Sequence, residues 1–217
     1  ARLAIAGDHV LLCAAFDAAI AVTAALGVVE PYSSGLGGGG FYLLHFAESE
    51  KNVFIDAREM APGLASESLY LDELGKAVPQ RSREGPLAAA IPGIPAALQH
   101  LSKHYSKLSL AETLRPAIKL AHDGFAVDPR FVRAVGWVEK RLRKFAGAES
   151  VFFNAGEAFE LGQILKQPQL AETLTELAKD NDSFYHGKLA REMVNFVSAA
   201  GGNWTLSDLE RYEVKER

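Results

Sequence analysis

Cysteine is almost absent from this chain, and so is any excess of positive charge. Its 217 residues include a single cysteine, Cys13, so no disulfide can form within the chain. Cys13 lies in the apolar run 11–15, which favours a small buried residue over a nucleophile or a metal ligand. The formal net charge of -4 offers no overall basic field for nucleic acid or anionic lipid. We therefore expect no nucleic-acid partner.

A long uncharged hydrophobic segment is missing as well. Residues 10–29 approach the length of a membrane-spanning helix, but Asp17 interrupts them. A charge in the middle of a membrane costs roughly 2.5 to 3.5 kcal/mol, and alanine, the commonest residue here, offsets little of it. Only Arg2 could supply a basic region before the segment, so a signal peptide is not indicated either. The pattern predicts a helix buried on most faces, in which Asp17 needs a partner such as a backbone amide or the Thr23 hydroxyl.

The residues of a dinucleotide-binding motif are present, but the secondary structure expected on either side of them does not fit that motif. The motif Gly35-x-Gly37-x-x-Gly40 must follow a strand and open a helix, so that the helix N-terminus meets pyrophosphate. In this chain the order is reversed, because an alanine-rich helical segment precedes the glycines and an aromatic strand follows them. Nucleotide binding is therefore excluded.

Motifs for a metal ion and for a serine nucleophile are incomplete. His100 and His104 have the i, i+4 spacing that places two imidazoles on one metal, but Leu101 stands where the metalloprotease motif needs glutamate. With no third ligand nearby, we expect both histidines on a helix surface, and no metal or other cofactor is implied. Ser33 and Ser34 lack the Gly-x-Ser-x-Gly context of an exposed nucleophile, so they are interpreted as turn and capping hydroxyls.

What the chain does contain is a strand pair that ends in a charged cluster. The apolar runs Phe41–Phe46 and Asn52–Ala57 are joined by a polar segment, which predicts an antiparallel hairpin. Alternation along the second strand places Asp56 and Arg58 on one face. The rigid fork of donors on Arg58 matches a carboxylate in two places. From spacing alone two interpretations stay open: a carboxylate-binding group, or an ion pair of Arg58 with Asp56 or Glu59.

Most of the remaining sequence predicts helices. The signals for their first turns lie at Ser109, Asp128, Pro168 and Lys188. The second of these helices carries a basic cluster, Lys140, Arg141, Arg143 and Lys144. We expect this cluster to be a solvated face balanced by Glu139 and Glu149 rather than an anion site. The segment from Gly75 to Gly85 is the expected flexible loop. Helices around one hairpin predict an α+β fold with a helical layer.

Several motifs occur in a fixed order along almost the whole chain. They are Asp17-Ala18-Ala19, Glu30-Pro31-x-Ser33-Ser34-Gly35-x-Gly37-Gly38-Gly39-Gly40, Asp56-x-Arg58-Glu59-x-Ala61-Pro62, Ile91-Pro92-Gly93, Phe184-Tyr185-x-Gly187, and Thr205-Leu206-x-Asp208-Leu209 with Tyr212. In these motifs the chain resembles the N-terminal part of the gamma-glutamyltransferase family, also called gamma-glutamyltranspeptidases or glutathione hydrolases. The glycine loop joined to Asp-x-Arg-Glu carries most of the specificity.

The resemblance implies a fold and a role for one residue. The fold is a partial N-terminal-nucleophile hydrolase αββα sandwich, helix-rich, with an N-terminal helix and a strand hairpin. Residues 1–217 would be a single incomplete domain, the N-terminal portion of the large subunit of a self-processing precursor. In the family the arginine of the Asp-x-Arg-Glu motif holds the alpha-carboxylate of the gamma-glutamyl group. The resemblance therefore implies that Arg58 binds a gamma-glutamyl substrate such as glutathione.

The family's nucleophile has no counterpart in this chain. Family members cut themselves before a threonine, whose new N-terminal amine then serves as its base. The resemblance therefore implies no catalytic residue here, an inactive isolated chain, and two partners: the rest of the large subunit and a small subunit that carries the threonine. It also implies a periplasmic or extracellular location, although no signal region is seen.

Two departures and three alternatives accompany this resemblance. Leu12-Cys13-Ala14-Ala15 stands where the family usually has Gly-Gly-Asn-Ala, and Tyr32 stands where histidine is common. Neither change touches Arg58. The alternatives are a cephalosporin (glutaryl) acylase, a poly-gamma-glutamate processing enzyme, or a catalytically silent module used for binding or assembly.

Overall fold

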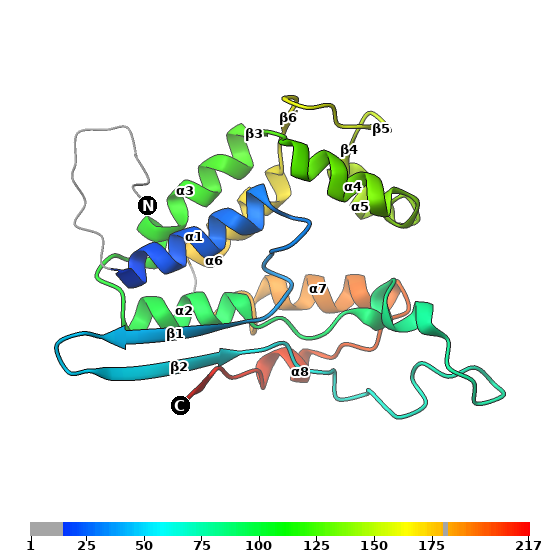
Figure 1. Cartoon of the computed structure of the whole chain (residues 1–217). Helices are drawn as coiled ribbons and strands as arrows, with labels where there is room; N and C mark the ends of the chain where they lie inside the picture. Colours follow the sequence, from blue (N-terminus) through cyan, green and yellow to red (C-terminus); the bar gives the residue numbers. More distant parts are fainter. Residues whose placement is uncertain (1–14, 180–181) are drawn as a thin grey trace.

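The structure, a computed structural model, describes residues 15–179 and 182–217 (Figure 1). The expected burial of Cys13, and most of the departure at residues 12–15, therefore lie outside the described residues. None of the helices in the described part of the chain combines the length and the apolar character needed to span a bilayer.

The predicted helix and hairpin open the described chain. Helix α1 (Ala15–Val29) leads through the glycine loop to strand β1 (Gly40–Phe46), which pairs antiparallel with β2 (Lys51–Ala57). The register sets Phe41 opposite Asp56 and Leu44 opposite Val53. Because side chains alternate along a strand, the residues of β2 that face the core, Val53, Ile55 and Ala57, are all buried. The order helix, glycines, strand is the one the sequence indicates, but the predicted burial of the helix on most faces is wrong, because α1 buries one stripe: Asp17, Ile20, Ala24 and Val28.

Helices make up most of the rest. In chain order they are α2 (Ile94–His104), α3 (Leu110–Asp123), α4 (Pro129–Leu142), α5 (Ala146–Phe152), α6 (Pro168–Lys179), α7 (Lys188–Ala199) and α8 (Leu206–Glu210). The predicted capping box is present at Ser109, and Gly124 ends α3 with a φ of 92°. Asp128 caps α4 as expected, but α4 ends at Leu142, before the basic cluster is complete.

The helices form a layer on one side of the hairpin. Helix α3 packs against both α1 and α6, and α2 contacts both α1 and β2. Figure 1 accordingly shows α1, α3 and α6 together, with α2 between them and the hairpin. The main core lies between these elements, and its fully buried side chains include Ile20, Ile55, Leu98, Leu114 and Leu174. The predicted α+β arrangement with a helical layer is confirmed.

A second, smaller core lies under α4. Phe131 and Val135 of α4 pack with Phe153 and Leu165 in this core. The chain here forms the short strands β3 (Phe125–Ala126), β4 (Phe153–Asn154), β5 (Glu157–Ala158) and β6 (Ile164–Leu165). Pairing of β3 with β6 ties the end of α3 to the segment before α6. Helix α4 is therefore buried on one side only.

The buried carboxylate of α1 has partners far along the chain. Asp17 is fully buried, and its Oδ1 accepts hydrogen bonds from the Lys107 and Leu108 backbone N–H groups, both at 3.0 Å. The Ser106 hydroxyl donates to the same oxygen. Thr23 was the wrong hydroxyl, because its Oγ1 accepts instead from the Tyr42 hydroxyl at 3.3 Å. Asp17 thereby fastens α1 to the α2–α3 connection.

The sheet has an open edge and an open face. Its third strand, β7 (Lys215–Glu216), pairs with β2, so the order is β1-β2-β7. Among the described residues no strand pairs with the other side of β1, and Phe41 and Leu43 are 53% and 72% exposed. Unpaired edges and apolar side chains of this kind normally acquire a cover. The exposed edge agrees with the expectation of further chain or a partner.

The segment from Gly75 to Gly85 contains more structure than the sequence indicates. It includes a 3-10 helix, η1 (Pro79–Ser82), and a second one, η2 (Pro86–Ala88), follows directly. An isolated bridge joins Leu71 to Ala77 across the turn at Gly75, whose φ is 74°. Glu84, between the two 3-10 helices, is brought against α4.

Candidate functional site at Arg58

Arg58 lies directly after β2, at the polar end of a strand whose inner face is buried. Its side chain is 66% exposed. The backbone around it is fixed: its N–H donates to Asp56 Oδ1 at 3.2 Å, and its carbonyl accepts from the Tyr212 hydroxyl at 2.9 Å. The structure thus holds the main chain in place and leaves the guanidinium in solvent.

The charges beside Arg58 pair mostly with other groups. Asp56 Oδ2 lies 3.2 Å from Arg217 Nη2, so Asp56 is not the ion-pair partner of Arg58. Glu59 Oε2 lies 3.5 Å from Arg58 Nε. Within residues 15–179 and 182–217, the terminal nitrogens of Arg58 have no ion-pair partner. The fork that would bind a carboxylate therefore points to solvent with its outer donors free.

The glycine loop packs closely against the backbone that carries Arg58. A Cβ on Gly39 would lie 2.3 Å from the Glu59 nitrogen and 2.8 Å from the Ala57 oxygen, which no side chain tolerates. The Gly38 carbonyl accepts from the N–H groups of Gly93 and Ile94, at 2.9 and 3.0 Å. None of the glycines in the loop has a positive φ. Close approach, rather than left-handed backbone, therefore explains the glycine at position 39.

Gly93 is the second point of close approach. A Cβ there would lie 2.0 Å from the Ala57 oxygen and 2.3 Å from the Tyr212 hydroxyl. The start of α2, the end of β2 and the segment after α8 therefore meet around one glycine. This arrangement sets the position of the residue that follows Ala57, which is Arg58.

Tyr212 is the residue that sequence reasoning did not assign to this site. Burial, followed by the negative charges of Asp56 and Glu59, raises the pKa of Tyr212 to about 12. The hydroxyl therefore stays protonated near neutral pH and remains a donor to the Arg58 carbonyl. Its ring stacks on Tyr185, with centroids 5.5 Å apart. The sequence places this tyrosine after the Thr-Leu-x-Asp-Leu motif, but it does not indicate that the tyrosine hydroxyl donates to the Arg58 carbonyl.

The turn after Arg58 is held by α8. Asp208 accepts hydrogen bonds from the Gly63 N–H at 2.8 Å and from the N–H and hydroxyl of Thr205. Burial acts to raise the pKa of Asp208, but these hydrogen bonds outweigh it, so the pKa lies below its usual value. Thr205 and Asp208 form a capping box at the start of α8, and this short helix also anchors the Arg58 segment.

The two histidines on α2 serve a structural contact. His104 is exposed, but His100 is half-buried rather than on the open surface, because its Nε2 lies 3.0 Å from Glu216 Oε2 of β7. The Tyr105 hydroxyl donates to the same oxygen at 2.6 Å. No group of three or more metal-ligating side chains occurs in the described part of the chain. These contacts hold the third strand against α2.

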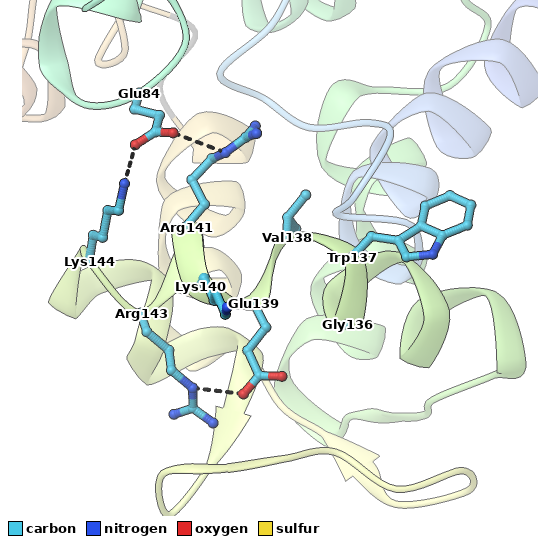
Figure 2. Close-up of a pocket in the computed structure, with 9 residues that line it drawn as sticks. All are labelled: Glu84, Gly136, Trp137, Val138, Glu139, Lys140, Arg141, Arg143 and Lys144. Carbon is cyan, nitrogen blue, oxygen red and sulfur yellow. Dashed lines mark hydrogen bonds and ion pairs between the residues drawn. The ribbon is translucent and has the colours of Figure 1, made fainter. Parts of the chain in front are cut away.

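The basic cluster of α4 splits into two sets. Arg143 pairs with Glu139 at 2.9 Å and with Glu149 at 3.4 Å, as expected. Arg141 and Lys144 instead reach Glu84, at 3.3 and 2.7 Å, which spacing along α4 could not indicate. Glu84, Glu139 and these cations line a hollow of about 560 Å³. Figure 2 shows the pairs of Glu84 with Arg141 and Lys144 and of Arg143 with Glu139, with Trp137 projecting away from Glu84.

The similarity to known proteins extends over almost the whole chain. The family model described as gamma-glutamyltranspeptidase matches residues 6–217. Over 203 residues the chain is 37% identical to the glutathione hydrolase proenzyme of Bacillus subtilis (strain 168), an alignment that covers 92% of this chain and 34% of that protein. The chain thus spans about a third of the length of the curated relatives it matches.

The fold of this chain is also similar to solved structures of related proteins. Gamma-glutamyltranspeptidase from Helicobacter pylori aligns with a TM-score of 0.91 at 36% identity, over 94% of this chain and 59% of that chain. A cephalosporin acylase from Bacillus halodurans aligns with a TM-score of 0.81 at 29% identity, over 94% of this chain and 39% of that chain. The predicted fold class, a partial N-terminal-nucleophile hydrolase sandwich, is confirmed.

Proposed function

The chain belongs to the gamma-glutamyltranspeptidase family, and on that premise we propose that it is part of an enzyme that transfers or hydrolyses gamma-glutamyl groups. Residues 1–217 form the N-terminal portion of its large subunit. In this proposal Arg58 binds the alpha-carboxylate of a gamma-glutamyl donor such as glutathione, and the threonine nucleophile is supplied from outside this chain.

The state of Arg58 is the observation that supports this role. Its main chain is fixed through Tyr212 and Asp56, while its side chain is 66% exposed with free terminal donors. A fixed backbone raises the affinity of a binding group for its ligand, because less conformational entropy is lost on binding. A purely structural arginine would instead be expected to bind a neighbouring carboxylate through the two terminal nitrogens of its guanidinium group.

The competing interpretation is the ion pair with Glu59. Its 3.5 Å separation involves only Nε, and both side chains are partly in solvent, where such pairs contribute about 0 to 1 kcal/mol. The pair leaves the outer face of the guanidinium open to a bidentate partner. Glu59 then orients Arg58 from one side while a substrate carboxylate binds on the other.

Substitution of Arg58 in the full-length protein tests this role. Arg58→Ala removes a charge-assisted contact of about 1.5 to 3 kcal/mol, so we expect the KM for a gamma-glutamyl anilide to rise about 10- to 150-fold. Arg58→Lys keeps the charge but not the fork, and should recover part of the loss. Arg191→Ala, an exposed arginine of α7, is the matched control. An unchanged KM in Arg58→Ala would contradict the substrate-binding role and would favour a structural ion pair with Glu59.

The isolated 217-residue chain gives a separate test. We expect the homogeneous chain to release no p-nitroaniline from a gamma-glutamyl anilide, because the nucleophile is absent from it. Turnover by this chain alone would contradict the proposal that the nucleophile is supplied from outside it. Native material should contain a second chain that begins with threonine, which mass spectrometry would detect.

A second candidate activity is favoured by one comparison. The similarity to a cephalosporin acylase shows that this architecture occurs in a protein named for a different acyl substrate. Arg58 would then meet the carboxylate of another acyl side chain. The ratio of kcat/KM for a gamma-glutamyl anilide to that for a glutaryl anilide separates the two activities, because only the former carries an alpha-amino acid group.

A periplasmic or extracellular location is part of the same proposal. It is supported only by the family resemblance. Fractionation of cells that express the full-length protein would test it, and recovery of the protein entirely with cytosolic markers would contradict it.

A further inference from the structure

Helix α4 presents one long positively charged face to solvent. At 100° per residue, this face of α4 consists of Arg130, Arg133, Trp137, Lys140 and Arg141, and Lys144 continues it just beyond the end of the helix at Leu142. We call these six residues the α4 stripe. Every one of them is exposed, whereas Phe131 and Val135 on the opposite face are buried in the second core. The stripe is about 20 Å long.

The stripe has little negative charge of its own. Glu84 pairs with Arg141 and Lys144. The other carboxylates near α4 are used elsewhere: Asp128 caps the helix through the Phe131 N–H at 2.7 Å, and Glu139 and Glu149 bind Arg143. Among the described residues, no ion pair engages Arg133 or Lys140. A chain with a formal net charge of -4 therefore carries a locally cationic surface.

Trp137 stands in the middle of this surface without a packing partner. Its side chain is 83% exposed, while the other tryptophan, Trp204, is 7% exposed. Figure 2 shows Trp137 directed away from the ion pairs that Glu84 makes with Arg141 and Lys144. A large indole left in water loses the free energy that burial of its apolar area would give. Tryptophan is enriched at membrane interfaces, where its apolar ring and its N–H are both accommodated.

We propose that the α4 stripe docks this protein on the surface of an anionic phospholipid bilayer. The long lysine and arginine side chains reach the headgroup phosphates, and Trp137 enters the headgroup layer between them. A straight, convex helix face suits a flat surface. A peptide partner would instead be expected to use an apolar groove or a sheet edge, whereas the hollow beside the stripe is lined mostly by charged side chains. The proposal is independent of the role given to Arg58.

Vesicle sedimentation tests this docking. We expect the 217-residue chain to cosediment with vesicles that contain phosphatidylglycerol, to stay in the supernatant with pure phosphatidylcholine, and to dissociate in high salt. A lysine or arginine near an anionic surface contributes about fivefold in affinity. Arg133→Glu with Lys140→Glu should therefore weaken binding by more than about 30-fold.

A charge-matched pair controls for net charge. Lys103→Glu with Arg191→Glu makes the same change in net charge at exposed positions of α2 and α7, and should leave binding unchanged. Trp137→Ala should weaken binding and abolish the blue shift of tryptophan fluorescence that vesicles induce, because Trp204 is already buried. Matching circular dichroism spectra and melting temperatures establish that each variant is folded.

Three results with the 217-residue chain would overturn the proposal. They are equal binding to neutral and anionic vesicles, equal losses in the two double variants, and retention on soluble polyglutamate or heparin without any binding to vesicles. The third result would identify a soluble polyanion as the ligand of the stripe. Loss of vesicle binding when the chain is part of the full-length protein would show that the stripe is covered, which also overturns docking in the mature enzyme.

Discussion

Arg58 and the α4 stripe present positive charge to solvent in two different ways. Arg58 is a single cation whose backbone is fixed by segments from four parts of the chain, near Gly39, Gly93, Asp208 and Tyr212. The stripe consists of five cations and one tryptophan, all supplied by α4 except Lys144, which lies just beyond its end. The first arrangement fixes one donor group in place, as recognition of one small carboxylate requires. The second spreads charge over a long surface and fixes none of it closely.

The difference predicts that a small change to backbone packing damages the Arg58 region and not α4. Gly93→Ala places a Cβ 2.0 Å from the Ala57 oxygen. We expect the free energy of unfolding to fall by about 3 kcal/mol or more, because backbone must move to relieve the overlap. Urea denaturation measures this.

Gly136 on α4 provides the control for that substitution. Apart from its chain neighbours and the nearby backbone of its own helix, no atom lies within 4 Å of a Cβ built there, so Gly136→Ala should raise the free energy of unfolding by about 0.5 to 1 kcal/mol through helix propensity. If Gly93→Ala unfolds at the same urea concentration as the parent chain, the close packing around Arg58 is not as described.

A smaller effect is expected from the carboxylate that anchors the turn after Arg58. Asp208→Asn removes charge-assisted hydrogen bonds from Thr205 and Gly63, and should cost about 1 to 3 kcal/mol at pH 7. The folded pKa of Asp208 is lowered, so its stabilising contribution is present above the unfolded pKa of about 3.9. That contribution is lost as pH falls through the lower folded value.

Urea titrations of the parent chain and Asp208→Asn at several pH values would measure this dependence. The gap between the two proteins should be constant near neutral pH and should narrow in acid. A gap that widens below pH 4 would show that the carboxylate does not carry the stabilisation.

The smallest effect is expected on the stripe itself. Glu84→Gln removes the carboxylate that pairs with Arg141 and Lys144. Since one negative charge leaves the surface, affinity for vesicles containing phosphatidylglycerol should rise about fivefold. Glu172→Gln, an exposed carboxylate of α6, is the control. A fall in affinity with Glu84→Gln would mean that Glu84 orders the stripe for binding rather than opposing it.

Local features of the fold could be predicted from the sequence because they depend on near neighbours. The hairpin follows from alternation in two short apolar runs, and its buried residues are those that alternation selects. The capping boxes at Ser109 and Thr205 follow from residues three positions apart. The motif order also pointed to the family, which the comparisons confirm.

Interactions between distant segments could not be predicted in this way. The sequence predicts a backbone amide or a hydroxyl such as that of Thr23 as the partner of Asp17, but it does not indicate that residues 106–108 supply both kinds of donor. Glu84 joins the α4 cations from a loop far earlier in the chain. His100 was expected on an open surface, but β7 covers it in part. In each case the spacing along the chain carries no information about which segments fold against one another.

The sequence by itself determined the helix, the hairpin, the position of Arg58 at the end of a strand and the family to which the chain belongs. Its glycines, joined to the Asp-x-Arg-Glu motif, carried most of the specificity of that assignment. Only the tertiary structure decided which backbone those glycines approach, which tyrosine fixes Arg58, and that the α4 cations share one exposed face with Trp137. The physical reason is that burial and charge pairing depend on distances in space, which this chain sets by packing together segments that include residues 154 positions apart, such as Arg58 and Tyr212.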